Sequence, residues 1–481
     1  MAATAPAAPS ASAKDYRTGR VVGLATTAAL GGFLFGYDSA VINGATSAIK
    51  SLFGLSDLAI GFVVSIALIG SAIGAWFAGS LADRYGRRRV MLVAAALFLI
   101  AAVGQAFPFG VADLMLWRFI GGAGIGVASV MAPMYIAEIA PAQIRGRMGA
   151  LQQFAIVIGI FATGFVNYVI LQAAGGNARN VWLLGLEAWQ WMFLSMIAPA
   201  IVYGVLVLRI PESPRYLVAI NEPAKAAKVL STIYTIDVTP LVKDIEQTLA
   251  GDHKPRFSDI RGRALGLMPI VWIGIILSAF QQFVGINAVF YYSNTIWESV
   301  GFSESQAFQT SLITTGINVA FTVVAIALVD RVGRKPLLLV GSVGMVVTLA
   351  TLTWVFGTAA TNADGQPVLA DGPDVIALIA FNAYVAFFAA TWGPVVWVLL
   401  GEMFPNRIRA TALAVAVAAQ WGANFIVSTS FPELAGISLG LAYGIFTAFA
   451  ILSIPFVMKY VRETKGVSLE DMGQLEGARA A

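Results

Sequence analysis

The motif Asp83-Arg84-Tyr85-Gly86-Arg87-Arg88 recurs in the second half of the chain as Asp330-Arg331-Val332-Gly333-Arg334-Lys335, and this repeat decides the fold. Each copy lies in a short charged loop between two long apolar runs. A smaller pair of charges also repeats, first as Glu138 with Arg145 and then as Glu402 with Arg409. Charged loops that return at equivalent places predict two copies of one helical unit, related by a pseudo-two-fold axis.

The composition of the 481 residues is that of an integral membrane protein. Hydrophobic residues make up 58% and charged residues 12% of the chain, and the mean hydropathy is +0.79. These values exclude a soluble globular protein. Runs of about 20 apolar residues match a helical membrane span, and the alternating strands of a barrel are absent. We count twelve runs, at 20–45, 58–82, 89–108, 112–139, 146–171, 190–210, 265–299, 305–330, 337–357, 374–403, 408–431 and 437–459.

One polar segment separates the runs into two groups of six. We therefore predict an all-α polytopic membrane protein with twelve transmembrane helices in two pseudo-symmetric six-helix bundles. The expected parts are a disordered N-terminal tail (1–19), the first bundle (20–210), linker helices (211–263), the second bundle (264–460) and a C-terminal tail (461–481).

The positive charges predict the orientation in the membrane. Of the 30 Lys and Arg residues, Lys50 and Arg179 fall in loops on one side and Arg118 lies inside a run, and the others lie on the side of the termini. The positive-inside rule places both termini in the cytoplasm of a multi-pass cell-membrane protein. The net charge of +4 then reflects topology, and no nucleic-acid partner is expected.

The stretch Gln281-Gln282-Phe283-Val284-Gly285-Ile286-Asn287 is unusually polar for a membrane span. Amides at this depth are costly unless they face a wet cavity or one another. Because amides both donate and accept, they suit the hydroxyls of a neutral polyol, and aromatic rings suit its C–H faces. The alternative for each amide is an interhelical hydrogen bond. The candidate amides within the runs are Gln152 and Gln153, Gln281, Gln282, Asn287 and Asn294, Asn318, and Gln420 and Asn424.

Two ionisable residues lie inside the spans. At 1.5 Å per residue, Asp38 lies about 27 Å along the first helix, and Arg118 enters from the opposite side, so both are expected at similar depth in the outer half. A carboxylate there can be neutralised by one proton, which marks an ion pathway. A static buried ion pair is the alternative.

Glycine and proline interrupt two spans beside the amides. Gly285 and the pair Gly393-Pro394 weaken or kink a helix, and we expect hinges there; mild packing kinks are the alternative. Gly70-x-x-x-Gly74 and Gly122-x-x-x-Gly126 indicate close helix contacts.

The doubled charged loops resemble the major facilitator superfamily. Pro211 to Arg215, Gln281 to Asn287 and Gly393 to Trp397 are similar to the sugar porter branch, and most to the bacterial D-xylose:proton symporters. The resemblance extends from about residue 20 to 470. Two positions depart from its pattern, with Arg462 in place of a proline and Gln190 in place of an arginine.

The resemblance implies roles for individual residues. Asp38 and Arg118 would couple the proton. The sugar contacts would be Gln153, Gln281, Gln282, Asn287, Asn318, Trp397 and Gln420. Phe35, Tyr291, Trp392 and Asn424 would line the cavity. A cytoplasmic gate would be formed by Asp83, Arg84, Arg88, Glu138, Arg145, Glu212, Arg215, Asp330, Arg331, Arg334, Glu402 and Arg409, with Arg87 also able to join it.

The function implied is proton-coupled symport of a monosaccharide of the D-xylose or D-glucose class, by alternating access and as a monomer. A uniporter of the same fold is the alternative, and a sugar sensor without transport a weaker one. With no cysteine, one histidine and no H-E-x-x-H motif, we expect neither an enzyme nor a metal or other cofactor.

Overall fold

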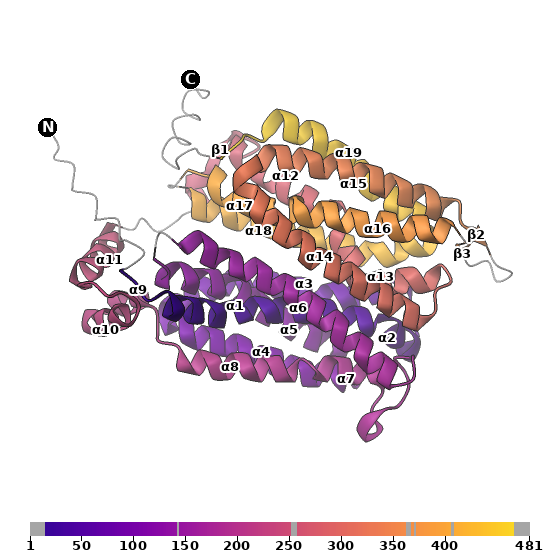
Figure 1. The fold of residues 1–481 in the computed structure, drawn as a ribbon, viewed down its shortest axis with the longest axis horizontal. Helices are drawn as coiled ribbons and strands as arrows, with labels where there is room; N and C mark the ends of the chain where they lie inside the picture. The colour runs from indigo at the N-terminus through magenta and orange to yellow at the C-terminus, as the bar shows by residue number, and fades with distance from the viewer. Residues whose placement is uncertain are drawn as a thin grey trace.

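The structure is a computed structural model that describes residues 15–141, 144–251, 257–361, 367–369, 372–405 and 408–465. The described chain is nearly all helical, and Figure 1 shows long helices running side by side in an N-terminal and a C-terminal half. The fold class predicted from the sequence is confirmed.

The N-terminal half holds the helices of the first repeat. They are α1 (Thr18–Val41), the 3₁₀ turn η1 (Ile42–Gly44), α2 (Thr46–Phe53), α3 (Asp57–Tyr85), α4 (Arg87–Ala106), α5 (Val111–Ile139), α6 (Arg145–Ala173), the 3₁₀ turn η2 (Leu183–Gly185), α7 (Ala188–Leu194) and α8 (Ile197–Arg209).

Short helices follow, and then the second repeat. The linker segment contains α9 (Pro214–Ala219), α10 (Pro223–Ile233), α11 (Thr239–Gly251), η3 (Phe257–Ile260) and β1 (Arg261–Ala264). The C-terminal half contains α12 (Pro269–Phe283), α13 (Ile286–Ser299), α14 (Glu304–Val332), α15 (Arg334–Gly357), β2 (Ala360–Thr361), β3 (Pro367–Val368), α16 (Pro373–Ala390), α17 (Trp392–Met403), α18 (Arg409–Ile437) and α19 (Leu439–Tyr460). Strands β2 and β3 pair antiparallel.

Twelve segments of the described chain are long and apolar enough to span a membrane, which confirms the predicted number. Three of them are interrupted: α7 and α8, α12 and α13, and α16 and α17 each form one span. We call the end of the bundle that carries α9 to α11 the terminal end, and the opposite end the far end (Figure 1).

Small residues bring α3 and α5 into close contact. An added Cβ at Gly70 or Gly74 would collide with the backbone of α5, and one at Gly122 or Gly126 would collide with the backbone of α3. The two glycine motifs therefore face each other, as the sequence predicts, and this packing stiffens the N-terminal half.

The residues before α1 tie the linker helices to the N-terminal half. Tyr16 forms an antiparallel bridge with Tyr234, and the Arg17 amide donates to the Ile233 carbonyl at 2.8 Å. The linker helices are thus fixed beside α1 by backbone hydrogen bonds.

The halves are joined by hydrogen bonds near the far end. Asn43 Nδ2 donates to Ser293 Oγ at 3.0 Å, and the Asn294 amide donates to Asn43 Oδ1 at 3.1 Å. Ser47 Oγ donates to Glu298 Oε2 at 2.7 Å. Since these bonds link η1 and α2 to α13, the structure shows a state in which the far end is closed.

Candidate functional site

Four amide side chains form one hydrogen-bonded chain in the C-terminal half. Asn287 Nδ2 donates to Gln282 Oε1 at 2.5 Å, and Gln282 Nε2 donates to Gln281 Oε1 at 3.4 Å. Gln420 of α18 donates to the same Gln281 oxygen at 2.5 Å. Residues from α12, α13 and α18, far apart in the sequence, thus share one polar cluster.

The amide chain leaves an acceptor unused. Gln420 Oε1 is buried and has no hydrogen-bond partner within the described part of the chain. An unpaired buried acceptor is costly, and a ligand hydroxyl could donate to it. The cluster therefore suits a neutral ligand rich in hydroxyl groups better than an ion.

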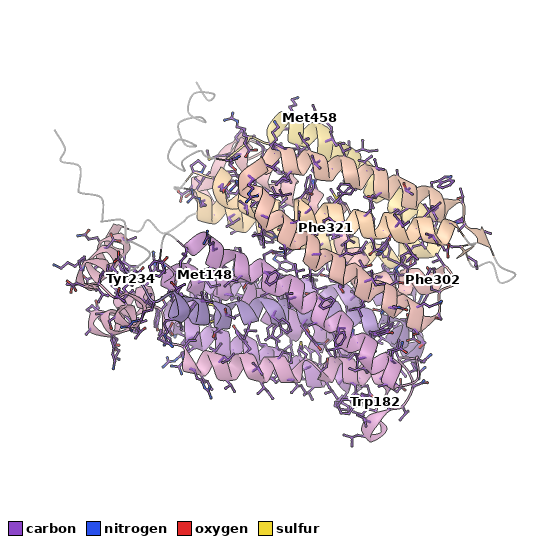
Figure 2. All side chains as sticks on the ribbon, in the orientation of Figure 1. Met148, Trp182, Tyr234, Phe302, Phe321 and Met458 are labelled. Atoms are coloured by element: carbon purple, nitrogen blue, oxygen red, sulfur yellow. The ribbon has the colours of Figure 1, made fainter. Side chains whose placement is uncertain are left out.

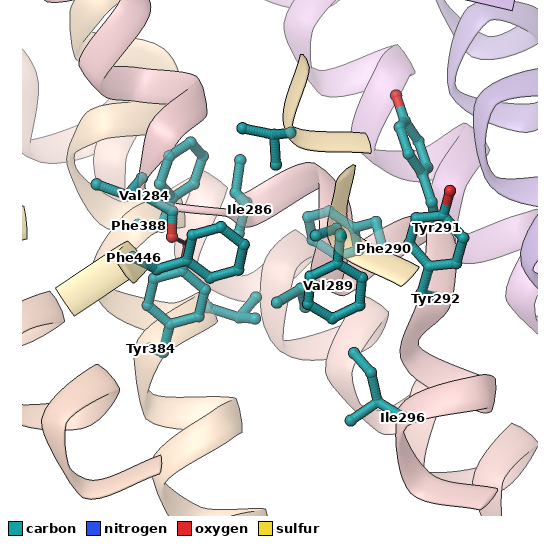
Figure 3. Close-up of a cluster of buried hydrophobic side chains, with 14 of the residues drawn as sticks. Val284, Ile286, Val289, Phe290, Tyr291, Tyr292, Ile296, Tyr384, Phe388 and Phe446 are labelled. Carbon is teal, nitrogen blue, oxygen red and sulfur yellow. Dashed lines mark hydrogen bonds between the residues drawn. The ribbon is translucent and has the colours of Figure 1, made fainter. Parts of the chain in front are cut away.

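The break between α12 and α13 positions Asn287. Gly285 adopts a left-handed conformation, with φ of 89°, and α13 restarts at Ile286. Tyr384 Oη donates to the freed carbonyl of Val284 at 2.7 Å, and Figure 3 shows Tyr384 and Phe446 beside this turn. A Cβ at Gly285 would collide with the Phe446 ring, so the position requires glycine. Movement at this break remains a prediction.

The second break differs from the sequence prediction. Helix α16 ends at Ala390, and Thr391 leaves helical geometry with φ of −137° and ψ of −87°. Gly393 and Pro394 therefore lie in the first turn of α17, where a proline loses no intrahelical hydrogen bond. The interruption lies two residues before this pair, and a hinge at Gly393-Pro394 remains a prediction.

Gln281 connects the two breaks. Its Nε2 donates to the carbonyls of Trp392 and Gly393, each at 3.0 Å. Those carbonyls belong to the first turn of α17, just after the interruption at Thr391. One side chain of α12 thus holds the start of α17 in place as well as the amide chain.

Aromatic side chains lie on both sides of the contact between the halves. Phe35 of α1 and Trp421 of α18 have ring centroids 6.0 Å apart, and Trp397 is 40% exposed. Tyr291 is buried, and the Asn424 side chain lies beside its hydroxyl group. Figure 3 shows Tyr291 and Tyr292 on the side of α13 away from Tyr384.

The side chain of Trp392 packs against α15. Its side chain is fully buried, and its indole N–H donates to Leu338 O at 3.0 Å and to Ser342 Oγ at 3.1 Å, both on α15. It packs within the C-terminal half in this structure, and a role in lining the cavity remains a prediction. Its carbonyl, and not its ring, contacts the amide cluster.

Two further amides predicted to contact the ligand lie outside this hydrogen-bonded chain. Gln153 is partly exposed on α6, and Asn318 is buried on α14; α6 and α14 pack against each other. The neighbouring Gln152 lies against Gly32 of α1. A ligand role for Gln153 and Asn318 remains a prediction.

Asp38 and Arg118 are neighbours in the buried N-terminal half. Arg118 Nη1 lies 4.0 Å from Asp38 Oδ2. The guanidinium instead donates to the carbonyls of Asp38 and Val64, at 3.4 and 3.3 Å, and to Gln105 Oε1 at 3.4 Å. Both carboxylate oxygens of Asp38 are buried without a hydrogen-bond partner among the described residues.

Sequence reasoning missed Gln105, Asn43 and Trp421. Gln105 lies near the end of α4 and is fully buried beside Arg118. The available signal was an amide within an apolar run, since Gln105 lies in the run 89–108 and Asn43 in the run 20–45. Trp421 directly follows Gln420 and could have been found from that neighbour alone.

A charged network closes the helix ends of the N-terminal half. Arg87 binds Glu138 with two hydrogen bonds, Nη2 to Oε1 at 2.8 Å and Nε to Oε2 at 3.0 Å. Ser213 Oγ also donates to Glu138. Glu212 Oε1 accepts the backbone N–H groups of Arg87 and Ser213, at 2.9 and 2.8 Å. The network joins α4, α5 and the segment before α9.

The C-terminal half repeats this network. Arg334 binds Glu402 with Nη2 to Oε1 at 2.7 Å and Nε to Oε2 at 3.0 Å, and Thr464 Oγ1 donates to Glu402 at 2.6 Å. Glu463 accepts the backbone N–H groups of Arg334 and Lys335, each at 3.0 Å. The sequence echoes Pro211 to Arg215 in Arg462 to Gly466, but Glu463 and Thr464 were not among the residues predicted for the gate.

The surroundings of Glu463 favour its charged form. Partial burial acts to raise the pKa of Glu463, but backbone N–H groups of Arg334, Lys335, Thr464 and Lys465 outweigh it and hold the pKa below its ordinary value. The carboxylate therefore caps the start of α15 as an anion.

The other residues predicted for the gate have varied positions. Asp83 is mostly exposed, 3.3 Å from Arg87; Arg84 lies over the Tyr85 ring; Arg88 donates to Leu208 O at 2.7 Å. Arg215 is partly exposed and Arg331 exposed. The side chains of Arg145 and Asp330 lie outside the described part.

Arg409 does not pair with Glu402 as the repeat suggested. Its Nε and Nη2 donate to the Phe404 carbonyl at 3.2 and 3.1 Å, so Arg409 stabilises the turn after α17. The Glu402 carboxylate binds Arg334 instead. The contacts described for each network lie within its own half of the molecule. Locking between the halves remains a prediction.

Comparisons with known proteins agree with this architecture. A family model described as "Sugar (and other) transporter" matches residues 24–475. The chain is 54% identical over 446 residues to the glucose transport protein of Synechocystis, covering 92% of this chain and 95% of that protein. It is 39% identical over 496 residues to the D-xylose-proton symporter of Escherichia coli, covering 96% of each.

Solved structures show the same fold. The partially occluded inward-open structure of the xylose transporter XylE from E. coli has a TM-score of 0.79 and 37% identity, covering 93% of this chain and 99% of that one. The XylE structure bound to 6-bromo-6-deoxy-D-glucose has a TM-score of 0.77 and 38% identity, covering 96% and 100%.

Proposed function

The chain belongs to the sugar transporter family of the major facilitator superfamily, and we propose that it carries a monosaccharide of the D-xylose or D-glucose class together with a proton, by alternating access. Its relatives in this family are transporters and not enzymes. Similarity to the glucose transport protein and to the D-xylose-proton symporter supports both sugar classes.

The observation that carries the symport proposal is the state of Asp38. A fully buried carboxyl group 4.0 Å from the nearest guanidinium nitrogen, with the neutral Gln105 side chain beside it, fits a protonated side chain. An ionised one would need close partners at that depth. Asp38 therefore holds the transported proton while the far end is closed.

The amide cluster binds the sugar in this account. Gln281, Gln282, Asn287 and Gln420 pair with one another here, and sugar hydroxyls would replace those bonds at little net cost. Phe35 and Trp421 would cover the apolar faces of the sugar ring from the two halves. Gln153, Asn318, Trp397 and Tyr291 would complete the site.

Coupling follows from the position of the two sites. Arg118 has other acceptors when Asp38 is neutral, and would turn to the carboxylate when the proton leaves. Tyr291 of α13 lies near Arg118 and Asp38. Helix α13, which also carries Asn287, would therefore connect the proton site with the amide chain.

We further propose that the chain is a monomer in the cell membrane with the terminal end in the cytoplasm. The Lys and Arg residues of that end support this orientation. The far end would then face outward, the structure would be inward-facing, and the Arg87 and Arg334 networks would form a gate at the cytoplasmic side.

Proton movement during sugar transport tests the proposal. In weakly buffered proteoliposomes, adding xylose or glucose should cause alkalinisation outside, and Asp38→Asn should abolish it while exchange of labelled sugar continues. Sugar transport by the unaltered protein without any proton movement would identify a uniporter instead.

A further inference from the structure

The segment between α6 and α7 forms a hairpin at the far end. Val181 bridges Glu187 antiparallel, the Trp182 amide donates to the Leu186 carbonyl at 2.8 Å, and η2 (Leu183–Gly185) forms the tip. In Figure 1 the hairpin projects sideways beyond α7, away from the bundle, and Figure 2 labels Trp182 within it.

The tip is apolar and exposed. Val181 is 66%, Leu183 50% and Leu184 86% exposed. Leu184 also adopts a left-handed backbone conformation, with φ of 55°, which is unfavourable for a side chain of this kind. A large apolar residue in such a turn is doubly unfavourable if the tip is surrounded by water.

Polar groups of the hairpin are satisfied at its base. Arg179 pairs with Glu187 at 3.4 Å, and the indole N–H of Trp189 donates to the same carboxylate at 2.8 Å. The indole N–H of Trp191 donates to Leu183 O at 3.0 Å. The base therefore holds the tip in a fixed shape and keeps charge away from it.

The hairpin continues the surface that faces lipid. The membrane span begins at Ala188, directly after it, and α8 in the same span exposes Val202 (52%) and Leu208 (54%). A hairpin that leaves the end of a membrane span and projects sideways lies at the depth of the lipid headgroups. Tryptophans such as Trp182 and Trp191 are typical of that layer.

We propose that residues 181–186 insert into the headgroup and upper acyl layer of the far-end leaflet, as a lipid anchor for the N-terminal half. The partner is the bilayer surface itself. Apolar side chains at the tip enter the acyl boundary, while Arg179 and Glu187 stay at the water side, as in other interfacial elements. Rocking of the halves would then occur against an N-terminal half held in the leaflet.

Site-directed spin labelling tests this proposal, because the chain has no cysteine. Leu184→Cys, labelled with a nitroxide, is compared in nanodiscs holding one copy of the protein. Two matched controls are Asn177→Cys at the exposed base of the same loop and Val202→Cys on the lipid-facing side of α8. The measurement is collisional accessibility to oxygen and to a nickel chelate.

We expect the label at Leu184 to be several-fold less accessible to the nickel chelate than the label at Asn177, and to have an oxygen accessibility closer to that at Val202. Equal nickel accessibility at Leu184 and Asn177 would overturn the proposal. So would protection that occurs only in crowded liposomes and is lost in single-copy discs, since a second protein molecule would then cover the tip.

Discussion

Gln281 has two tasks at the centre of the site. It accepts from Gln282 and Gln420, and it donates to the carbonyls at the start of α17. In the proposed site such a residue would be both a ligand group and a structural support, so its loss should affect sugar affinity more than the loss of an amide at the edge of the site.

Replacing Gln281 with Ala should weaken sugar binding about tenfold or more, since one lost hydrogen bond with unpaired partners costs about 1–3 kcal/mol. Equilibrium binding of xylose and glucose to purified protein measures the effect. Gln309→Ala, on the exposed face of α14, is the matched control and should bind as before. Unchanged affinity in Gln281→Ala would remove it from the site.

Asn43 joins η1, at the end of α1, to α13. Its side chain makes two hydrogen bonds across the halves, and each is worth about 1 kcal/mol. Asn43→Ala should therefore shift molecules from the far-end-closed state toward the open one.

Electron–electron distances between nitroxides at Leu52→Cys on α2 and Gln309→Cys on α14 report that shift. The population with the longer distance should grow several-fold in Asn43→Ala. Asn177→Ala, in a loop at the same end, should leave the distribution unchanged. An unaltered distribution in Asn43→Ala would mean that closure depends on other contacts.

At the level of elements, the two breaks place the site. The α12–α13 break could be predicted, because Gly285 weakens the helix at the point where several costly amides gather. The break at Thr391 could not, since the sequence marks it only with the Gly393-Pro394 pair, which a helix accepts in its first turn.

The orientation of Trp392 was unpredictable for a related reason. Helix α17 is apolar on all sides, so its sequence does not indicate which face meets α15 and which meets the cavity. By contrast, Arg334 and Glu402 could be recognised from the repeat as the equivalents of Arg87 and Glu138, because charged residues in apolar surroundings are few.

Gly285→Ala should destabilise the protein by about 1–3 kcal/mol, because it forces a left-handed alanine and a collision with Phe446. A lower melting temperature of the detergent-solubilised protein measures this. Gly79→Ala on α3, where an added Cβ meets open space, is the control. Equal melting temperatures would show that the α12–α13 break relaxes freely.

Glu463 makes the stability of the folded protein depend on pH in the acid range. Its pKa lies below the ordinary value in the folded protein, so its stabilising contribution is complete above the unfolded pKa of about 4.3. That contribution is lost as the pH falls through the lower, folded pKa.

Glu463→Gln should therefore melt at a lower temperature than the unaltered protein at pH 7, and the difference should shrink below about pH 4. Thermal unfolding across this pH range is the measurement. Glu433→Gln, for which no such cap exists among the described contacts, serves as the comparison. A difference that stays constant into acid would mean that the cap acts without its charge.

At the level of the whole molecule, each half has its own task. The amide chain belongs to the C-terminal half, and Asp38 with Arg118 belongs to the N-terminal half. The halves meet through η1, α2 and α13 at the far end, and also where α3 packs against α18 and α6 against α14. In the proposed mechanism, proton and sugar would thus bind on opposite sides of the surface that must open and close.

The division into halves was predictable from the repeated loops, but the state of the molecule was not. Closure of the far end depends on hydrogen bonds from residues such as Asn43 and Ser47, which look like ordinary helix-end polar residues in the sequence. Contacts that exist in one state only leave no periodic pattern.

Sugar accumulation in proteoliposomes under an imposed pH gradient tests the central claim most directly. With one proton carried per sugar, the steady-state ratio of inside to outside sugar should rise about tenfold for each pH unit, because one unit corresponds to about 1.4 kcal/mol. Asp38→Asn should equilibrate sugar and accumulate none. A ratio of one at every gradient in the unaltered protein, with sugar still exchanging, would contradict proton-coupled symport.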